Sequence, residues 1–201
     1  MFGLPRSIVR FRRAAHSTAL SLSLGVLTAS SGLADGAQVP PGLQAELVAK
    51  LAAYDRNFAA RAGETAHLLL LVNPKDPRSA ASATAMRNAL RSVGTIGGLP
   101  HVESLVTYET PATLANRCRA EHAAILYVTP GFDDQLDALR NALSELDLLT
   151  VAAERDAVAR GMVLGFDVVA GKLKLVVNLS QAKRQNVAFR TEALALMVVI
   201  R

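Results

Sequence analysis

The chain has 201 residues, 51% of them apolar, with 4% aromatic residues and no tryptophan. This composition supplies a core for one ordinary domain, but it offers few ring faces for stacking sugars and so argues against a lectin. The net charge of +5 invites a nucleic-acid reading, yet four of the 22 basic residues and none of the 17 acidic residues lie in the first 34 positions. The rest of the chain is nearly neutral and has no clustered basic face, which excludes nucleic-acid binding.

Residues 1–34 have the order of features of a secretory signal peptide. Four arginines precede a short apolar stretch at residues 19–27, and small residues then lead to Ala34. The apolar stretch is far shorter than the ~20 residues that a membrane-spanning helix needs. The alternative is an amphipathic N-terminal helix of a cytosolic protein, but the order of the three features favours a signal. We therefore expect cleavage near Ala34, export to the periplasm and no membrane insertion of residues 35–201, which form a single domain.

The segments after the signal alternate between helical and strand patterns. Apolar residues recur at helical spacing over residues 43–60, which predicts an opening helix. Short apolar runs then predict strands over residues 67–72, 101–108, 123–129 and 146–152. Helices are expected between them over residues 79–93, 111–121 and 133–143, the last capped by Asp133 or Asp134. This alternation is typical of a parallel sheet with helices on both faces.

The C-terminal part departs from this pattern. Two strand-like runs, residues 162–169 and 172–178, are separated only by Ala170 and Gly171, which suits a tight antiparallel hairpin. Lysines alternate with apolar residues in the second run, so we expect an edge strand there. A final helix is expected over residues 187–200. The predicted fold class is α/β, a three-layer sandwich whose mostly parallel sheet ends in an antiparallel β-hairpin and a terminal helix.

The sequence contains none of the common catalytic or phosphate-binding motifs, and its histidines lack metal-ligand spacing. We expect no enzymatic activity, no cofactor and no metal, although an enzyme with unrecognised chemistry is a third possibility behind the two functions given below. The single cysteine, Cys118, cannot form an intramolecular disulfide. Its neighbours Arg117 and Arg119 could lower the pKa of the thiol, but burial is the commoner outcome and is the one expected.

Two polar groups are candidate functional sites. The first is Tyr54, Asp55, Arg56 and Asn57 on the opening helix, with Arg61 following. Asp55 and Asn57 flank the apolar stripe, so they can tie the helix to neighbouring loops by hydrogen bonds. Alternatively the group is a recognition surface for a partner, with Arg56 and Arg61 offering bidentate donors to carboxylates.

The second group follows the predicted parallel strands. Open α/β sheets bind ligands at the carboxyl ends of their strands, where the strand order reverses. The candidate ligand-binding residues are Asn73 after the first strand, Thr129, Pro130 and Gly131 after the third, and Glu154 and Asp156 after the fourth.

Three segments together resemble the YfiR-like family of periplasmic proteins. They are residues 54–57, residues 126–131, and residues 175–179 followed by Ala182, Phe189 and Leu194. The resemblance covers almost all of the chain after the signal. It implies a compact α/β domain that tends to dimerise. It also implies regulation rather than catalysis, because the founding member represses an inner-membrane diguanylate cyclase by binding its periplasmic sensor region. That member carries several cysteines and this chain only one, so disulfide-based control within one subunit is not carried over.

The leading hypothesis is a non-enzymatic regulator that binds the sensor region of a membrane diguanylate cyclase or histidine kinase. The rival is a small-molecule binding protein that resembles one lobe of a periplasmic solute receptor, with dimerisation supplying the second wall.

Overall fold

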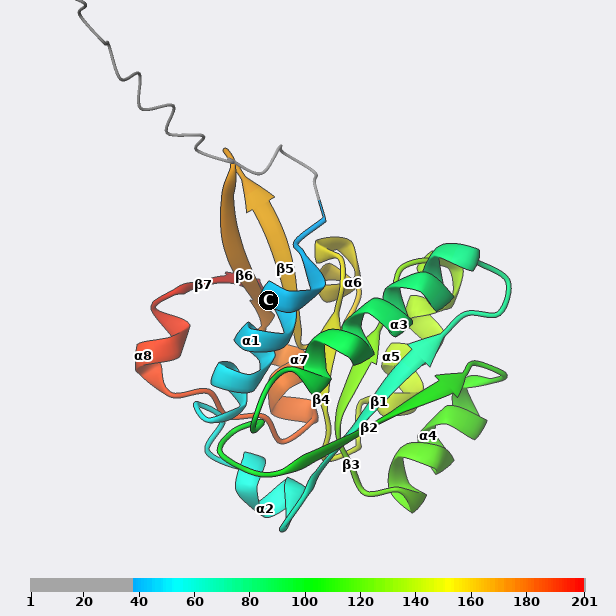
Figure 1. The fold of residues 1–201 in the computed structure, drawn as a ribbon, viewed down its shortest axis with the longest axis horizontal. Coiled ribbons are helices and arrows are strands. Elements are labelled where there is room, and N and C mark those ends of the chain that lie inside the picture. The colour runs from blue at the N-terminus through cyan, green and yellow to red at the C-terminus, as the bar shows by residue number, and fades with distance from the viewer. Residues whose placement is uncertain (1–37, 201) are drawn as a thin grey trace, which may run out of the picture. The chain divides into compact units, whose positions relative to one another are not determined.

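Seven strands form one sheet in the order β2-β1-β3-β4-β5-β6-β7 (Figure 1). The computed structural model describes residues 38–200. The strands are β1 (Ala66–Val72), β2 (His101–Thr107), β3 (Ala123–Val128), β4 (Leu149–Ala152), β5 (Leu164–Val169), β6 (Lys172–Asn178) and β7 (Met197–Ile200). The helices are α1 (Pro41–Ala52), α2 (Phe58–Ala62), α3 (Pro77–Arg91), α4 (Pro111–Ala120), the 3-10 helix η1 (Asp133–Gln135), α5 (Leu136–Leu143), α6 (Arg155–Ala159), α7 (Leu179–Arg184) and α8 (Thr191–Leu194).

Strands β2, β1, β3, β4 and β5 run parallel, and β6 then pairs antiparallel with β5. The parallel sheet and the antiparallel hairpin are therefore as the sequence predicts. The hairpin turn is Ala170 and Gly171, whose φ angles of 50° and 70° match a two-residue turn of the primed type. Strand β3 lies near the middle of the sheet and is buried at every position, which explains its continuous apolar sequence.

Alternate residues of the strands enter two separate cores, one on each face of the sheet. Leu68 and Leu70 of β1 belong to the core beneath α1 and α3, which pack against each other (Figure 1). Leu69 and Leu71 belong to the opposite core, with apolar residues of α4 and α5. The two cores and the sheet between them make the three layers that the fold class requires.

The opening helix is shorter than predicted. The expected helix over residues 43–60 ends at Ala52 in α1, and α2 begins only at Phe58. Asp55 lies between them and pairs as an isolated β-bridge with Phe189. Phe58 belongs to α2 and is buried, so the helical spacing of apolar residues continues across the break. The sequence pattern alone therefore does not reveal the break.

The prediction of a final helix over residues 187–200 is wrong. The structure has α8 at residues 191–194 and then β7, which pairs parallel with β6. The β-branched residues Val198, Val199 and Ile200 favour a strand. Because β7 lies along Leu175–Asn178, β6 is not the edge strand that its alternating lysines predict. The expected cap by Asp133 or Asp134 is also wrong, since both lie within η1 and neither caps a helix.

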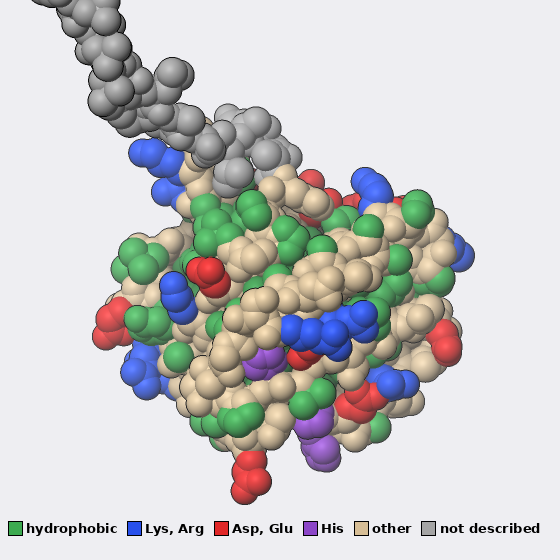
Figure 2. Space-filling model, in the orientation of Figure 1, with side chains coloured by type: hydrophobic (Ala, Val, Ile, Leu, Met, Phe, Trp, Pro, Cys, Tyr) green, Lys and Arg blue, Asp and Glu red, His purple; other side chains and the backbone are tan. Residues whose placement is uncertain are grey.

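Within residues 38–200, no helix is both long enough and apolar enough to cross a bilayer. The predicted signal peptide, residues 1–34, lies outside the described residues. On the face shown in Figure 2, acidic and basic side chains are interspersed rather than gathered by sign. Such a face fits the nearly neutral charge balance of the chain after residue 34.

Candidate functional site

The strand order reverses between β1 and β3, which places the topological switch point at their carboxyl ends. Asn73 follows β1 and Thr129 follows β3, so the structure brings these two predicted residues to the same place. The Asn73 N–H donates to Ser79 Oγ at 2.7 Å, and Thr129 Oγ1 lies 2.6 Å from the same hydroxyl. Thr129 in turn donates to the carbonyl of Leu71 at 2.7 Å. These buried groups satisfy one another, so hydrogen bonds within the chain occupy the polar groups at the switch point.

Gly131 completes this closed network. Its carbonyl accepts a hydrogen bond from the side-chain amide of Asn73. Its φ is +89°, and a Cβ there would lie 2.4 Å from Oδ2 of Asp76. Asp76 caps α3 by accepting from the N–H of Arg78. The Arg78 guanidinium also donates to this carboxylate and holds the pKa of Asp76 below its ordinary value. Glycine is therefore required where the chain passes this cap.

The remaining predicted ligand residues line two cavities at the same edge of the sheet. Glu154 and Asp156 line one of about 440 Å³, while Pro130 and Arg78 line another of about 500 Å³. Burial raises the pKa of Glu154 and the charge of Asp133 raises it further, whereas Arg78 opposes both effects. The predicted residues thus share an edge but form two groups. Sequence reasoning missed Ser79 and Arg78, whose only sequence signal was their position at a helix start.

The segment of residues 54–57 is fixed by a buried carboxylate. Asp55 is 4% exposed. Its Oδ1 accepts from the N–H of Ala188 at 2.9 Å, and its Oδ2 accepts from Nη1 of Arg61 at 2.8 Å. The backbone of the segment also bonds to the C-terminal part, since Arg56 donates to the carbonyl of Ala188 at 3.0 Å. The interpretation that Asp55 ties its segment to a neighbouring loop is therefore confirmed.

Arg61 extends this contact into a cluster of four side chains. Nε of Arg61 donates to Oδ1 of Asp147 at 2.6 Å, and Nη2 donates to the carbonyl of Asn186 at 2.9 Å. We call Asp55, Arg61, Asp147 and Asn186 the clasp. The side chain of Arg61 is only 2% exposed, so its donors serve the chain itself. That Arg61 contributes to partner binding stays a prediction. Such a contribution could act only through the clasp.

Two neighbours of the clasp remain on the surface. Tyr54 is 42% exposed, and Arg56 is exposed as well. The carbonyl of Tyr54 accepts from the N–H of Arg190 at 2.9 Å, so the backbone beneath both side chains is held on each side. Asn57 is less available, because its side-chain amide donates to Asn186 at 2.9 Å. The structure therefore exposes the side chains of Tyr54 and Arg56 on a backbone that is held in place, and we call these two residues the exposed pair.

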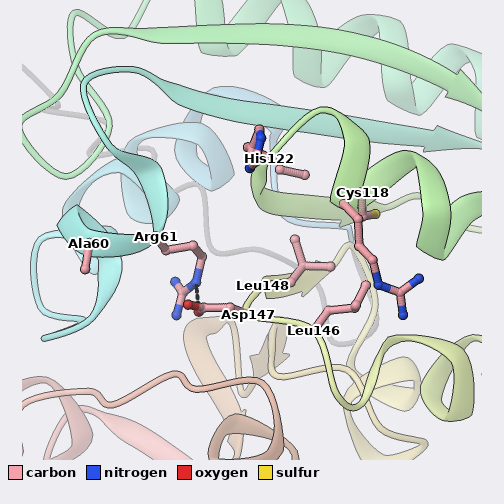
Figure 3. Close-up of a pocket in the computed structure, with 9 residues that line it drawn as sticks. Ala60, Arg61, Cys118, His122, Leu146, Asp147 and Leu148 are labelled. Carbon is pink, nitrogen blue, oxygen red and sulfur yellow. Dashed lines mark hydrogen bonds and ion pairs between the residues drawn. The ribbon is translucent and has the colours of Figure 1, made fainter.

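A hollow of about 310 Å³ lies beside the clasp, at the amino ends of β3 and β4 (Figure 3). We call it the amino-end hollow. Arg61 and Asp147 face each other on one side of it, and Cys118 of α4 lies on the other. The Cys118 side chain is buried, as the sequence predicts, and burial raises the pKa of its thiol to about 12. Among residues 38–200, no three His, Cys, Asp or Glu side chains gather as a metal site would require.

Several solved structures share this fold. A conserved domain protein from Vibrio cholerae is 17% identical with a TM-score of 0.55, covering 84% of this chain and 62% of that one. The ABC domain in complex with L-Trp from Streptococcus pneumoniae is 10% identical with a TM-score of 0.59, covering 80% and 60%. A ligand-free, open substrate-binding protein with adhesive properties from Clostridium difficile is 14% identical with a TM-score of 0.54, covering 84% and 61%. The chain thus spans only about three fifths of each of these structures, and the likeness establishes the fold alone.

No curated protein matches the sequence. The comparison with protein families is more specific than the structural likeness. Residues 42–196, however, match the model of a family described as YfiR/HmsC-like, and this range includes the clasp and the switch point. It also includes the segments that carry the resemblance noted from the sequence, which is thereby confirmed. The chain belongs to the YfiR/HmsC-like family.

Proposed function

We propose that the chain is a non-enzymatic periplasmic regulator that binds the sensor region of an inner-membrane signalling protein and modulates its output. The signalling protein is a diguanylate cyclase or a histidine kinase. Membership of a periplasmic, regulatory family is the observation that carries the proposal. The export signal expected over residues 1–34 supports it, because a sensor region facing the periplasm is then within reach.

The exposed pair Tyr54 and Arg56 supplies the partner surface in this proposal. Tyrosine and arginine are enriched among the residues that dominate protein interfaces. Backbone hydrogen bonds to Ala188 and from Arg190 hold the chain on both sides of the pair, which lowers the entropy lost when a partner binds. The Arg56 guanidinium suits a carboxylate on the partner. Arg61 contributes through the clasp by keeping the segment in place.

Deletion of the gene tests the regulatory role directly. We expect a change in cyclic di-GMP level, in biofilm formation or in the output of one histidine kinase. Reintroduction of the wild-type gene should restore the original value. If all three outputs are unchanged by the deletion, the regulator proposal is contradicted.

A matched pair of charge reversals tests the surface. Arg56→Glu should abolish complementation of the deletion strain, because it sets like charges against each other at the interface. Lys75→Glu makes the same reversal at an exposed position beyond β1 and should complement fully. Equal periplasmic levels of the two variants, measured by immunoblot, exclude a folding effect. Full complementation by Arg56→Glu would show that Tyr54 and Arg56 do not form the partner surface.

The second candidate function is small-molecule binding at the carboxyl ends of the strands. The two cavities of about 440 and 500 Å³ favour it, since both lie within the usual range for ligand pockets. In this case a metabolite should raise the melting temperature, and Glu154→Gln should remove the effect. A ligand that stabilises the protein without any change in signalling output would favour this function over regulation.

A further inference from the structure

The amino-end hollow lies at the opposite end of the strands from the ligand residues predicted by the switch-point rule. It is built by the ends of α2 and α4, the start of β3 and the loop before β4. Its volume of about 310 Å³ lies at the lower limit for small-molecule pockets and suits a small metabolite. Its lining combines charged side chains with buried apolar ones.

One side of the hollow carries a net negative charge. In the clasp, Asp55 and Asp147 share the single positive charge of Arg61, so one negative charge remains. Asp55 is buried, whereas the side chain of Asp147 is 49% exposed. The surplus charge is therefore accessible at Asp147. Asn186 also donates to Oδ2 of this carboxylate at 3.2 Å, which fixes the direction of the carboxylate.

The α4 side of the hollow carries a positive charge. Arg119 lines it, and Nη1 of Arg119 donates to the neutral amide oxygen of Asn116 at 3.1 Å. Among the described residues, no carboxylate lies within ion-pair distance of Arg119. His122 also lines the hollow, at a left-handed turn with φ of 48° between α4 and β3. The hollow thus carries an anionic group and an uncompensated cationic group.

The floor between these groups is apolar. Leu146 and Leu148 line the hollow and are 8% and 1% exposed, and Ala123 is 4% exposed. An uncharged polar molecule would gain little from the charges, and a simple ion would gain little from this floor. A molecule with both charges and an apolar group satisfies all three features.

We propose that the amino-end hollow binds an α-amino acid with an apolar side chain. The ammonium group pairs with Asp147, the carboxylate pairs with Arg119, and the side chain packs on Leu146 and Leu148. This inference does not rest on the regulatory function, because it is argued only from the side chains that line the amino-end hollow.

A thermal-shift screen of the exported chain against the twenty L-amino acids tests the proposal. At a concentration near 100 times the dissociation constant, an apolar amino acid should raise the melting temperature by about 5 °C or more. The amide of the same amino acid lacks the carboxylate, and the N-acetyl derivative lacks the ammonium. Each should bind at least about tenfold more weakly in calorimetric titration.

Variants then locate the site. Asp147→Asn and Arg119→Gln should each weaken binding by about tenfold or more. Asp137→Asn and Arg117→Gln make the same changes on exposed, ion-paired residues outside the hollow and should leave binding unchanged. Arg119→Gln keeps the test decisive even if Asp147→Asn loosens the clasp. The proposal is overturned if no amino acid shifts the melting temperature. It is also overturned if the hollow variants bind as tightly as the controls, or if Glu154→Gln alone abolishes binding.

Discussion

At Asp55 and Arg61 two opposite charges are almost completely removed from solvent, with exposed fractions of 0% and 2% for their side chains. Such a pair is costly to desolvate, so its net contribution to stability is small while it is intact. Removal of one partner is much more damaging, because the other charge is left buried without compensation. The clasp therefore acts at the residue scale to fix one geometry for the segment of residues 54–57.

Arg61→Met should lower the free energy of unfolding by about 3–5 kcal/mol, since it leaves the buried carboxylate of Asp55 without its opposite charge. The double variant Asp55→Asn with Arg61→Met should be more stable than Arg61→Met alone. Arg56→Met, at an exposed position, should stay within about 0.5 kcal/mol of the wild type. Urea denaturation followed by circular dichroism measures all three. A double variant less stable than the single one would contradict the description of the pair.

The Cys118 thiol predicts an alkaline dependence of stability. Its pKa is raised from 9.0 to about 12 in the folded chain, mainly by burial, so the folded chain keeps the thiol proton to higher pH than the unfolded chain. The stabilising contribution is therefore complete below about pH 9 and is lost as the pH rises towards 12. Urea midpoints at pH 8 and pH 10.5 should differ more for the wild type than for Cys118→Ala. Equal differences would mean that the thiol is not protected by burial.

At the scale of elements, the sheet is strongest at its centre. Leu126 of β3 is fully buried, whereas Leu105 of the edge strand β2 is 37% exposed. Leu126→Ala should cost about 2–5 kcal/mol of unfolding free energy, and Leu105→Ala less than about 1 kcal/mol. The urea midpoints at a constant m-value measure both changes. Equal losses would contradict the assignment of β2 to the edge.

The same contrast explains which elements could be predicted from the sequence. Strands β1 and β3 were predictable because their apolar runs stand between clear loop residues. The break after α1 was not, because it depends on Asp55 bonding to Ala188, 133 positions away. Strand β7 is only four residues long and continues the apolar spacing of a helix, so periodicity misassigned it.

The candidate site was predictable to a similar extent. The rule for open sheets correctly placed Asn73 and Thr129 together, because it depends only on the order of the elements. The rule could not show that the hydroxyl of Ser79 bonds to both residues. Nor could it show the clasp, since Arg61 meets Asp147 and Asn186 across separations of 86 and 125 positions.

At the scale of the whole molecule, the chain carries an α/β domain of the YfiR/HmsC-like family, and the proposed regulatory function requires that this domain be exported. The signal predicted over residues 1–34 should be removed. Mass spectrometry of the periplasmic protein should give the intact mass of a chain that begins at or near residue 35. A mass that includes the first methionine would contradict processing at Ala34.

The most direct test of the regulator is crosslinking in living cells with the tagged protein, followed by mass spectrometry of what is recovered with the inner membrane. We expect one diguanylate cyclase or one sensor kinase, with crosslinks that join its periplasmic region to the surface around Tyr54 and Arg56. Recovery should fall sharply for Arg56→Glu and should be unchanged for Lys75→Glu. Recovery of only the protein itself, with no membrane signalling protein in any sample, would contradict the proposed function.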